Sequence, residues 1–166
     1  MHKCSDMIHT EIEVKYMNSK KVNKALNQLL KGTHMGTSLF KFLQKKLKTK
    51  RLRKLWKEMI NTLFDHEKIL TKLIETYGGE PVDTAGIMGT MTDVLYKMRY
   101  IFLSDEKDIL ELSITSMEQG RKALSAFVSK KKFPNKDIDK IVRTMKKDYE
   151  EILYELKRFQ LEAQYV

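Results

Sequence analysis

Residues 52–79 read LRKLWKEMINTLFDHEKILTKLIETYGG, and this stretch decides the fold. Its apolar positions recur at alternating spacings of four and three residues, which is the pattern of one face of an α-helix. That face consists of Leu52, Trp56, Met59, Leu63, His66, Leu70, Leu73 and Tyr77. Gly78 and Gly79 stop the pattern, as glycines at helix C-termini do, and Pro81 confirms the break. The stretch therefore predicts one long amphipathic helix.

The same alternation precedes this stretch. A first helix is expected to begin after Ser19, a good N-cap residue, and to run to about Lys48. Its face is formed by Val22, Leu26, Leu29, Thr33, Gly36, Phe40, Leu43 and Leu47. Residues 1–18 show no sustained period, so we expect a flexible N-terminal extension there and a bundle domain over residues 19–166.

Two more helices are expected after the glycines. Ser104 is the expected cap of the third helix, whose first turn holds Asp105 and Glu106, where the helix dipole favours acids. Asn135 or Asp137 is the expected cap of the fourth. The third face has Leu110, Ile114, Met117, Leu124 and Val128, with Arg121 in the same register, and the fourth has Ile138, Val142, Met145, Tyr149, Ile152, Leu156 and Phe159.

No segment alternates convincingly with period two, so the sequence predicts an all-α four-helix bundle without a sheet. The connection from Gly78 to Leu103 is long and contains a shorter helical pattern at about residues 91–102. A connection of this length can cross the whole bundle, and the second and third helices would then run parallel.

Composition limits the classes of function. The 166 residues are 42% hydrophobic and 33% charged, with 7 glycines and 2 prolines, which is typical of a water-soluble helical protein. Cys4 is the only cysteine, so neither an intramolecular disulfide nor a cysteine zinc site is expected. No apolar run reaches the roughly 20 residues of a membrane span, and residues 1–15 do not resemble a secretory signal. We therefore expect a cytoplasmic protein.

Five short motifs stand in order along the chain: LLKGTHMG at residues 29–36, DHE at 65–67, GGEPVD at 78–83, GIMG at 86–89 and MEQG at 117–120. Together they resemble the ferritin-like superfamily, and in particular the rubrerythrin-related bacterial four-helix-bundle proteins of unknown function. The resemblance covers about residues 22–159. It implies a ferritin-like bundle with a long helical crossover between the second and third helices.

The resemblance also implies a possible di-metal site, built from one Glu on each of two helices and a Glu-x-x-His motif on each of the others. Thr33 and Met117 stand where the two single glutamates would be, and the fourth helix has no histidine. One alternative is a degenerate site without cofactor, in which His66 is a buried histidine bonded to Thr33, Glu118 or another neighbour. The other is a reduced site that binds iron or another divalent metal. The candidate ligands of that reduced site are His66, Glu118 and His34.

Charge is unevenly distributed along the chain. The formal net charge is +10, and no acidic residue lies between Val14 and Lys57. The candidate anion- or partner-binding residues are Lys45, Lys46, Lys48, Lys50, Arg51, Arg53 and Lys54, and a second basic cluster has Lys130, Lys131, Lys132 and Lys136. Basic surfaces bind acidic proteins, nucleic acids or anionic lipids. Trp56 is the only aromatic residue of the expected second helix that lies close to the first cluster. It falls on the core register, so base stacking is not indicated.

No glycine-rich phosphate loop, Ser-His-Asp order or paired histidine spacing occurs in the chain. The sequence therefore favours a non-enzymatic binding or structural accessory protein, which the resemblance would connect with stress or dormancy. We expect it to pair as a homodimer and to bind an acidic protein partner. The alternatives are a metal-binding protein with a site around His66 and non-specific nucleic-acid binding through the basic helix tips.

Overall fold

The computed structural model describes the backbone of residues 3–83, 105–130 and 136–164 and the side chains of residues 19–83, 105–129 and 136–162. These residues form four α-helices and no strand, as the sequence predicts. The helices are α1 (Lys3–Gln44), α2 (Lys50–Thr76), α4 (Glu106–Lys130) and α5 (Lys136–Gln164). The helical piece expected at residues 91–102 lies outside the described residues. No helix in the described ranges combines the length and the apolar character that a membrane crossing needs.

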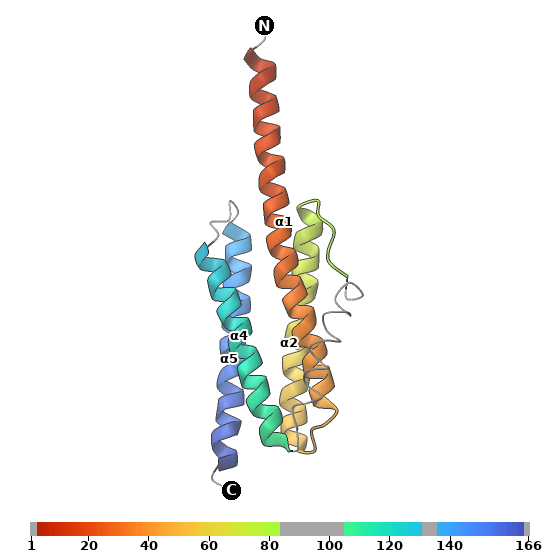
Figure 1. Ribbon diagram of the computed structural model, residues 1–166, viewed down its shortest axis with the longest axis vertical. Helices are drawn as coiled ribbons and strands as arrows, with labels where there is room; N and C mark the ends of the chain where they lie inside the picture. Colours follow the sequence, from red (N-terminus) through yellow and green to blue (C-terminus); the bar gives the residue numbers. More distant parts are fainter. Residues whose placement is uncertain (1–2, 84–104, 131–135, 165–166) are drawn as a thin grey trace.

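The four helices pack as two antiparallel hairpins. Helix α1 lies against α2 and α4 against α5, while weaker contacts join α1 to α4 and α2 to α5 (Figure 1). The start of α4 touches the α1–α2 turn, because Glu106 accepts a hydrogen bond of 2.7 Å from the N–H of Thr49. Helices α2 and α4 therefore run in the same direction, and the four closely packed pairs, α1–α2, α4–α5, α1–α4 and α2–α5, are each antiparallel.

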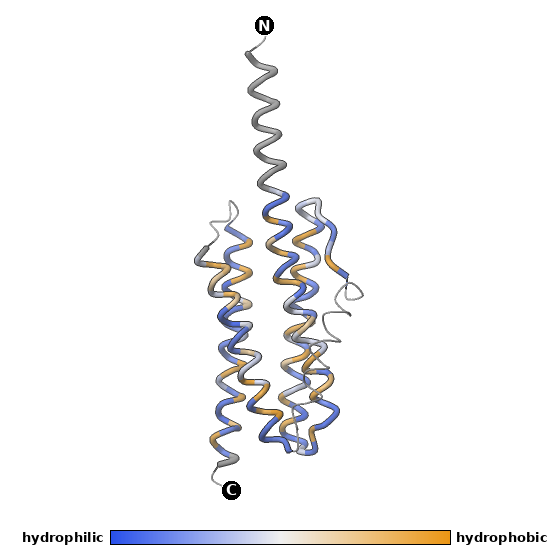
Figure 2. Tube along the Cα trace, viewed as in Figure 1, coloured by the Kyte–Doolittle hydropathy of each residue, from blue (hydrophilic) through white to orange (hydrophobic). Residues whose placement is uncertain are grey.

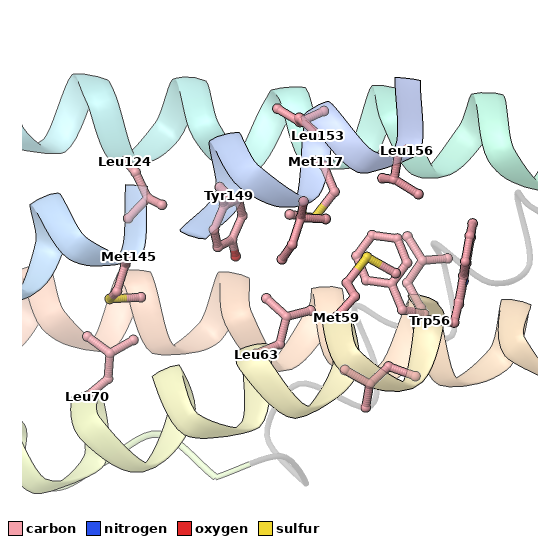
Figure 3. Close-up of a cluster of buried hydrophobic side chains, with 14 of the residues drawn as sticks. Trp56, Met59, Leu63, Leu70, Met117, Leu124, Met145, Tyr149, Leu153 and Leu156 are labelled. Atoms are coloured by element: carbon pink, nitrogen blue, oxygen red, sulfur yellow. The ribbon is translucent and has the colours of Figure 1, made fainter. Parts of the chain in front are cut away.

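The apolar stripes meet in one continuous core. Figure 2 shows apolar positions returning turn after turn along the helices, and Figure 3 shows their side chains interleaved between them. In α2 the predicted face is buried from Leu52 to Leu70, with Trp56, Leu63 and Leu70 at 0% exposure. In α1 the face is rotated slightly, since Leu30 and Thr37 are buried rather than Leu29 and Gly36.

Helix α1 begins at Lys3, so the expectation that it begins after Ser19 is wrong. The hydroxyl of Ser19 does not cap a helix but donates a hydrogen bond of 2.7 Å to the carbonyl of Tyr77. Residues 3–18 contain neither glycine nor proline, so nothing in them stops the helix from extending towards the N-terminus. The segment expected as a flexible extension is therefore helical from Lys3.

The cap of α4 also differs from the expectation. Asp105 occupies the N-cap position, and its Oδ1 accepts a hydrogen bond of 2.9 Å from the N–H of Asp108. Ser104, the expected cap, lies outside the described residues. Two carboxylates in the first turn favour the helix because they face its positive end.

A Schellman motif ends α2. The N–H of Gly79 bonds the carbonyl of Ile74, and the N–H of Gly78 bonds that of Glu75, both at 2.9 Å. Gly78 has a φ of +68°, in the left-handed region where a side chain is strained.

Gly78→Ala is expected to lower the free energy of unfolding by about 1 kcal/mol, because alanine is strained at this φ. Chemical denaturation measures the change. Gly32→Ala is the matched control, since a Cβ at this exposed helical position would meet nothing within 4 Å. The control should raise stability by about 0.5 to 1 kcal/mol, and equal effects of the two substitutions would contradict the assignment.

Candidate functional site

A layer of polar side chains crosses the middle of the bundle. Thr33, Thr37 and His66 are each 3% exposed, so they lie within the apolar core. His66 Nε2 lies 2.7 Å from Oδ2 of Asp148 on α5. Its Nδ1 has no hydrogen-bond partner among the described residues. The tautomer whose Nε2–H donates to the carboxylate and whose Nδ1 carries no proton leaves no buried donor unsatisfied, so it has the lowest desolvation penalty here.

Tyr149 joins α5 to the other three helices at this level. Its ring stacks on His66 of α2, with ring centroids 5.9 Å apart and an interplanar angle of 9°. Its hydroxyl hydrogen-bonds the Thr33 side chain of α1. On α4, a Cβ added at Gly120 would stand 2.5 Å from Cε1 of the ring. Figure 3 shows the ring pointing from α5 into the bundle.

Burial raises the pKa of Tyr149 to about 12. The hydrogen bond with Thr33 lowers the pKa, and the negative charge of Glu67 raises it. The phenol is therefore held protonated well above its ordinary pKa of 10.0.

Glu67 belongs to a second polar pair between α1 and α2. Its Oε1 lies 3.2 Å from Nδ1 of His34 and also accepts a hydrogen bond from the hydroxyl of Thr37. Both the His34 and the Glu67 side chains are largely buried, at 13% and 12% exposure. The resulting contacts hold α1 and α2 together beside the His66–Asp148 pair.

The structure does not bring the three candidate metal ligands together. His66 pairs with Asp148 and His34 with Glu67, whereas Glu118 accepts a hydrogen bond of 2.6 Å from Lys157. The Lys157 hydrogen bond and charge lower the pKa of Glu118. No group of three or more His, Cys, Asp or Glu side chains able to hold a metal occurs among the residues that the structure describes.

The two positions of the missing glutamates do not fit a metal either. The hydroxyl of Thr33 donates a hydrogen bond of 2.9 Å to the carbonyl of Leu29 and lies next to the phenol of Tyr149, so it is engaged within the bundle. Met117 is 1% exposed within the apolar core. The described residues therefore do not fit the di-metal site that the sequence resemblance implies, and the polar layer acts between helices.

The seven candidate anion-binding residues gather around the α1–α2 turn, at one end of the bundle (Figure 1). We call Lys45, Lys46, Lys48, Lys50, Arg51, Arg53 and Lys54 the basic end. All seven are exposed. The seven side chains differ in their contacts, and some of them bind other groups of the same chain.

Two arginines of the basic end are engaged within the protein. Arg51 pairs with Glu162 at 2.6 Å and stacks on Phe159, and Nε of Arg53 donates to the carbonyl of Leu47 at 2.7 Å. Lys46 lies over the ring of Phe42, and Lys54 approaches Glu58 at 3.9 Å, in a solvent-exposed pair.

Lys45, Lys48 and Lys50 project from the turn. Glu106 accepts hydrogen bonds from the N–H groups of Lys48 and Thr49 and from the Thr49 hydroxyl. Burial raises the pKa of Glu106, but these hydrogen bonds and the Lys48 charge lower it below its usual 4.5. The anion position at the start of α2 is thus filled by the chain's own carboxylate. Of the second basic cluster, the side chain of Lys136 is described, and it is exposed.

A groove between α2 and α5 was not foreseen from the sequence. It has a volume of about 390 Å³ and is lined by His66, Ile69, Asp137, Lys140, Ile141, Thr144, Met145 and Asp148. Most of these residues lie beside the core stripes rather than on them, so periodicity alone did not reveal the groove. Ile69, at the groove, is 40% exposed.

These features define a four-helix bundle whose central polar groups are bonded to one another. The chain belongs to the family described as a domain of unknown function (DUF2383), whose model matches residues 21–130. The match covers α1 from Lys21, α2 and α4. Neither the curated proteins nor the solved structures gave a match.

Tyr149→Phe is expected to reduce the loss of stability at high pH. Because the folded pKa is raised above the unfolded one, the stability that Tyr149 contributes is full below pH 10 and is lost as pH rises towards 12. Between pH 9 and pH 11 the wild-type protein should lose about 1.3 kcal/mol more than the variant. Chemical denaturation at the two pH values measures the difference, and parallel losses in both proteins would contradict the burial of the phenol.

Asp148→Ala should cost about 1 to 3 kcal/mol at neutral pH, because it leaves the buried imidazole of His66 without a partner. The double variant His66→Leu, Asp148→Ala should recover much of this loss, because no buried polar group is stranded. Glu151→Ala is the control, since its pair with Lys147 in the middle of α5 is exposed and is worth about 0.5 kcal/mol or less. Urea denaturation distinguishes the four proteins, and a double variant no more stable than Asp148→Ala would argue against the pair.

Proposed function

We propose that this protein is a non-enzymatic binding module that holds an acidic protein partner against its basic end. The observation that carries the proposal is the group of seven exposed lysines and arginines of the basic end, which lies in a stretch without acidic residues between Val14 and Lys57. Few cations are needed to offset the helix dipole at the C-terminus of α1, so the basic end holds more of them than capping requires. Lys45, Lys48 and Lys50 remain available for a partner in solvent.

The chemistry of the basic end favours an extended polyanion over a small anion. A small phosphate is usually held by converging backbone N–H groups, but here those of Lys48 and Thr49 are bonded to Glu106. The projecting lysines instead provide several flexible point charges. Acidic side chains spread along a protein surface match such charges, and the engaged aromatic rings of Phe42 and Phe159 support no base stacking.

We further propose that the bundle is ferritin-like and derives from a metal-binding ancestor. Support comes from the parallel α2 and α4, the antiparallel contacts of all neighbouring helices, and the polar layer at mid-bundle. In this protein Thr33 and Tyr149 would have replaced ligands with helix–helix contacts. A role in stress or dormancy rests on the sequence resemblance alone and is part of the proposal.

The triple variant Lys45→Gln, Lys48→Gln, Lys50→Gln should bind labelled poly-L-glutamate about tenfold more weakly than the wild-type protein, because each exposed ion pair contributes up to about 1 kcal/mol. Fluorescence anisotropy over a salt series measures this, and binding should weaken as salt rises. The matched control replaces three exposed lysines elsewhere, Lys24, Lys31 and Lys122, by glutamine.

Equal losses in the two triple variants would show that net charge, not the basic end, sets affinity. Tighter binding to double-stranded DNA than to poly-L-glutamate under the same conditions would replace the proposal with nucleic-acid binding. Absence of binding to either polymer would overturn it.

A further inference from the structure

The charge distribution restricts how two copies of this chain can meet. Helix α1 presents exposed lysines along its bundled length and no acid after Glu13; the lysines are Lys20, Lys21, Lys24, Lys31 and Lys41. Two copies that packed through this side would bring like charges together without compensation. A self-contact therefore requires a face on which acids and bases are balanced.

The face formed by α2 and α5 has this balance. Along the groove and within one helical turn of its lining residues, α2 and α5 carry equal numbers of acidic and basic residues. They are Asp65, Glu67, Asp137, Asp139, Asp148, Glu150 and Glu151 against Lys68, Lys72, Lys136, Lys140, Arg143, Lys146 and Lys147. A mixed face of this kind is complementary to itself, because a two-fold axis can set the acids of one copy opposite the bases of the other.

The same face has an apolar centre. Ile69 is 40% exposed beside Ile141 and Met145, and together they line the groove of about 390 Å³.

We propose that the α2–α5 face is the dimer interface, and that a second copy of this chain docks on it with the Ile69 side chains close to the two-fold axis. The groove lies towards the C-terminal half of α2 and the N-terminal half of α5, away from the α1–α2 turn (Figure 1). With the axis perpendicular to the helices, the basic ends of the two copies point in opposite directions, which minimises their repulsion. This inference is independent of the proposed function.

Sedimentation equilibrium over a concentration series tests the interface. The wild-type chain should dimerise, and Ile69→Lys should raise the dissociation constant of the dimer by about tenfold or more, because it places a charge at the centre of the interface. The matched control is Leu161→Lys, which alters an exposed apolar residue of α5 outside the groove. Both sites are exposed, and circular dichroism checks that each variant folds.

A Leu161→Lys dimer with the same dissociation constant as the wild-type dimer would support an interface centred on Ile69. A wild-type chain that stays monomeric throughout the series, or an Ile69→Lys variant that dimerises as well as the wild type, would overturn it. A monomeric result would leave the groove for a different occupant.

Disulfide trapping gives a second measurement. In a Cys4→Ser background, Ile69→Cys should form a covalent dimer under mild oxidation, because Cα atoms near a two-fold axis fall within the 4.4 to 6.8 Å, approximately, that a disulfide spans. Leu161→Cys should remain monomeric under the same conditions. Failure of Ile69→Cys to cross-link, or equal cross-linking of both variants, would contradict a two-fold axis at Ile69.

Discussion

The ring of Tyr149 is the contact on which the centre of the bundle depends. It stacks on His66 of α2, hydrogen-bonds Thr33 of α1 and occupies space that Gly120 of α4 leaves open. Contacts across the two hairpins are weaker than contacts within them, so one side chain that touches all four helices fixes how the hairpins meet. Interiors are close-packed, and a ring seated in this way restricts the rotation of each helix about its own axis.

The polar layer follows from that restriction. With the helices fixed in rotation, His66 faces Asp148 and Glu67 faces His34, and each polar group is bonded to another helix instead of to a metal. A buried polar group costs stability unless it finds a partner, and that penalty disfavours packings in which these pairs are broken. The layer thus specifies which helix faces meet, whereas the apolar residues around it supply most of the stabilisation.

Periodicity was sufficient to predict the helical class and most of the core. The alternation of fours and threes places Trp56, Leu63 and Leu156 correctly, because burial of an apolar stripe depends on spacing within one helix. Periodicity did not predict the features that depend on contact with another helix. The partner of His66 proved to be Asp148, Ser19 bonds Tyr77 instead of capping, and the groove arises only where α2 and α5 lie side by side. The residues of the basic end lie around the α1–α2 turn, but only the fold shows that Arg51 and Arg53 are bonded within the protein.

The separation of charge connects the two proposals in physical terms. Basic residues dominate α1 and the α1–α2 turn, while the α2–α5 face is nearly neutral, so a partner of opposite charge and a second copy are directed to different surfaces. A dimer built on the neutral face would carry two basic ends at its extremes. An acidic partner with widely spaced or repeated sites could then engage both ends, and the second contact would form at a high effective concentration. Weak individual ion pairs would in this way give useful affinity without a shaped pocket at the turn.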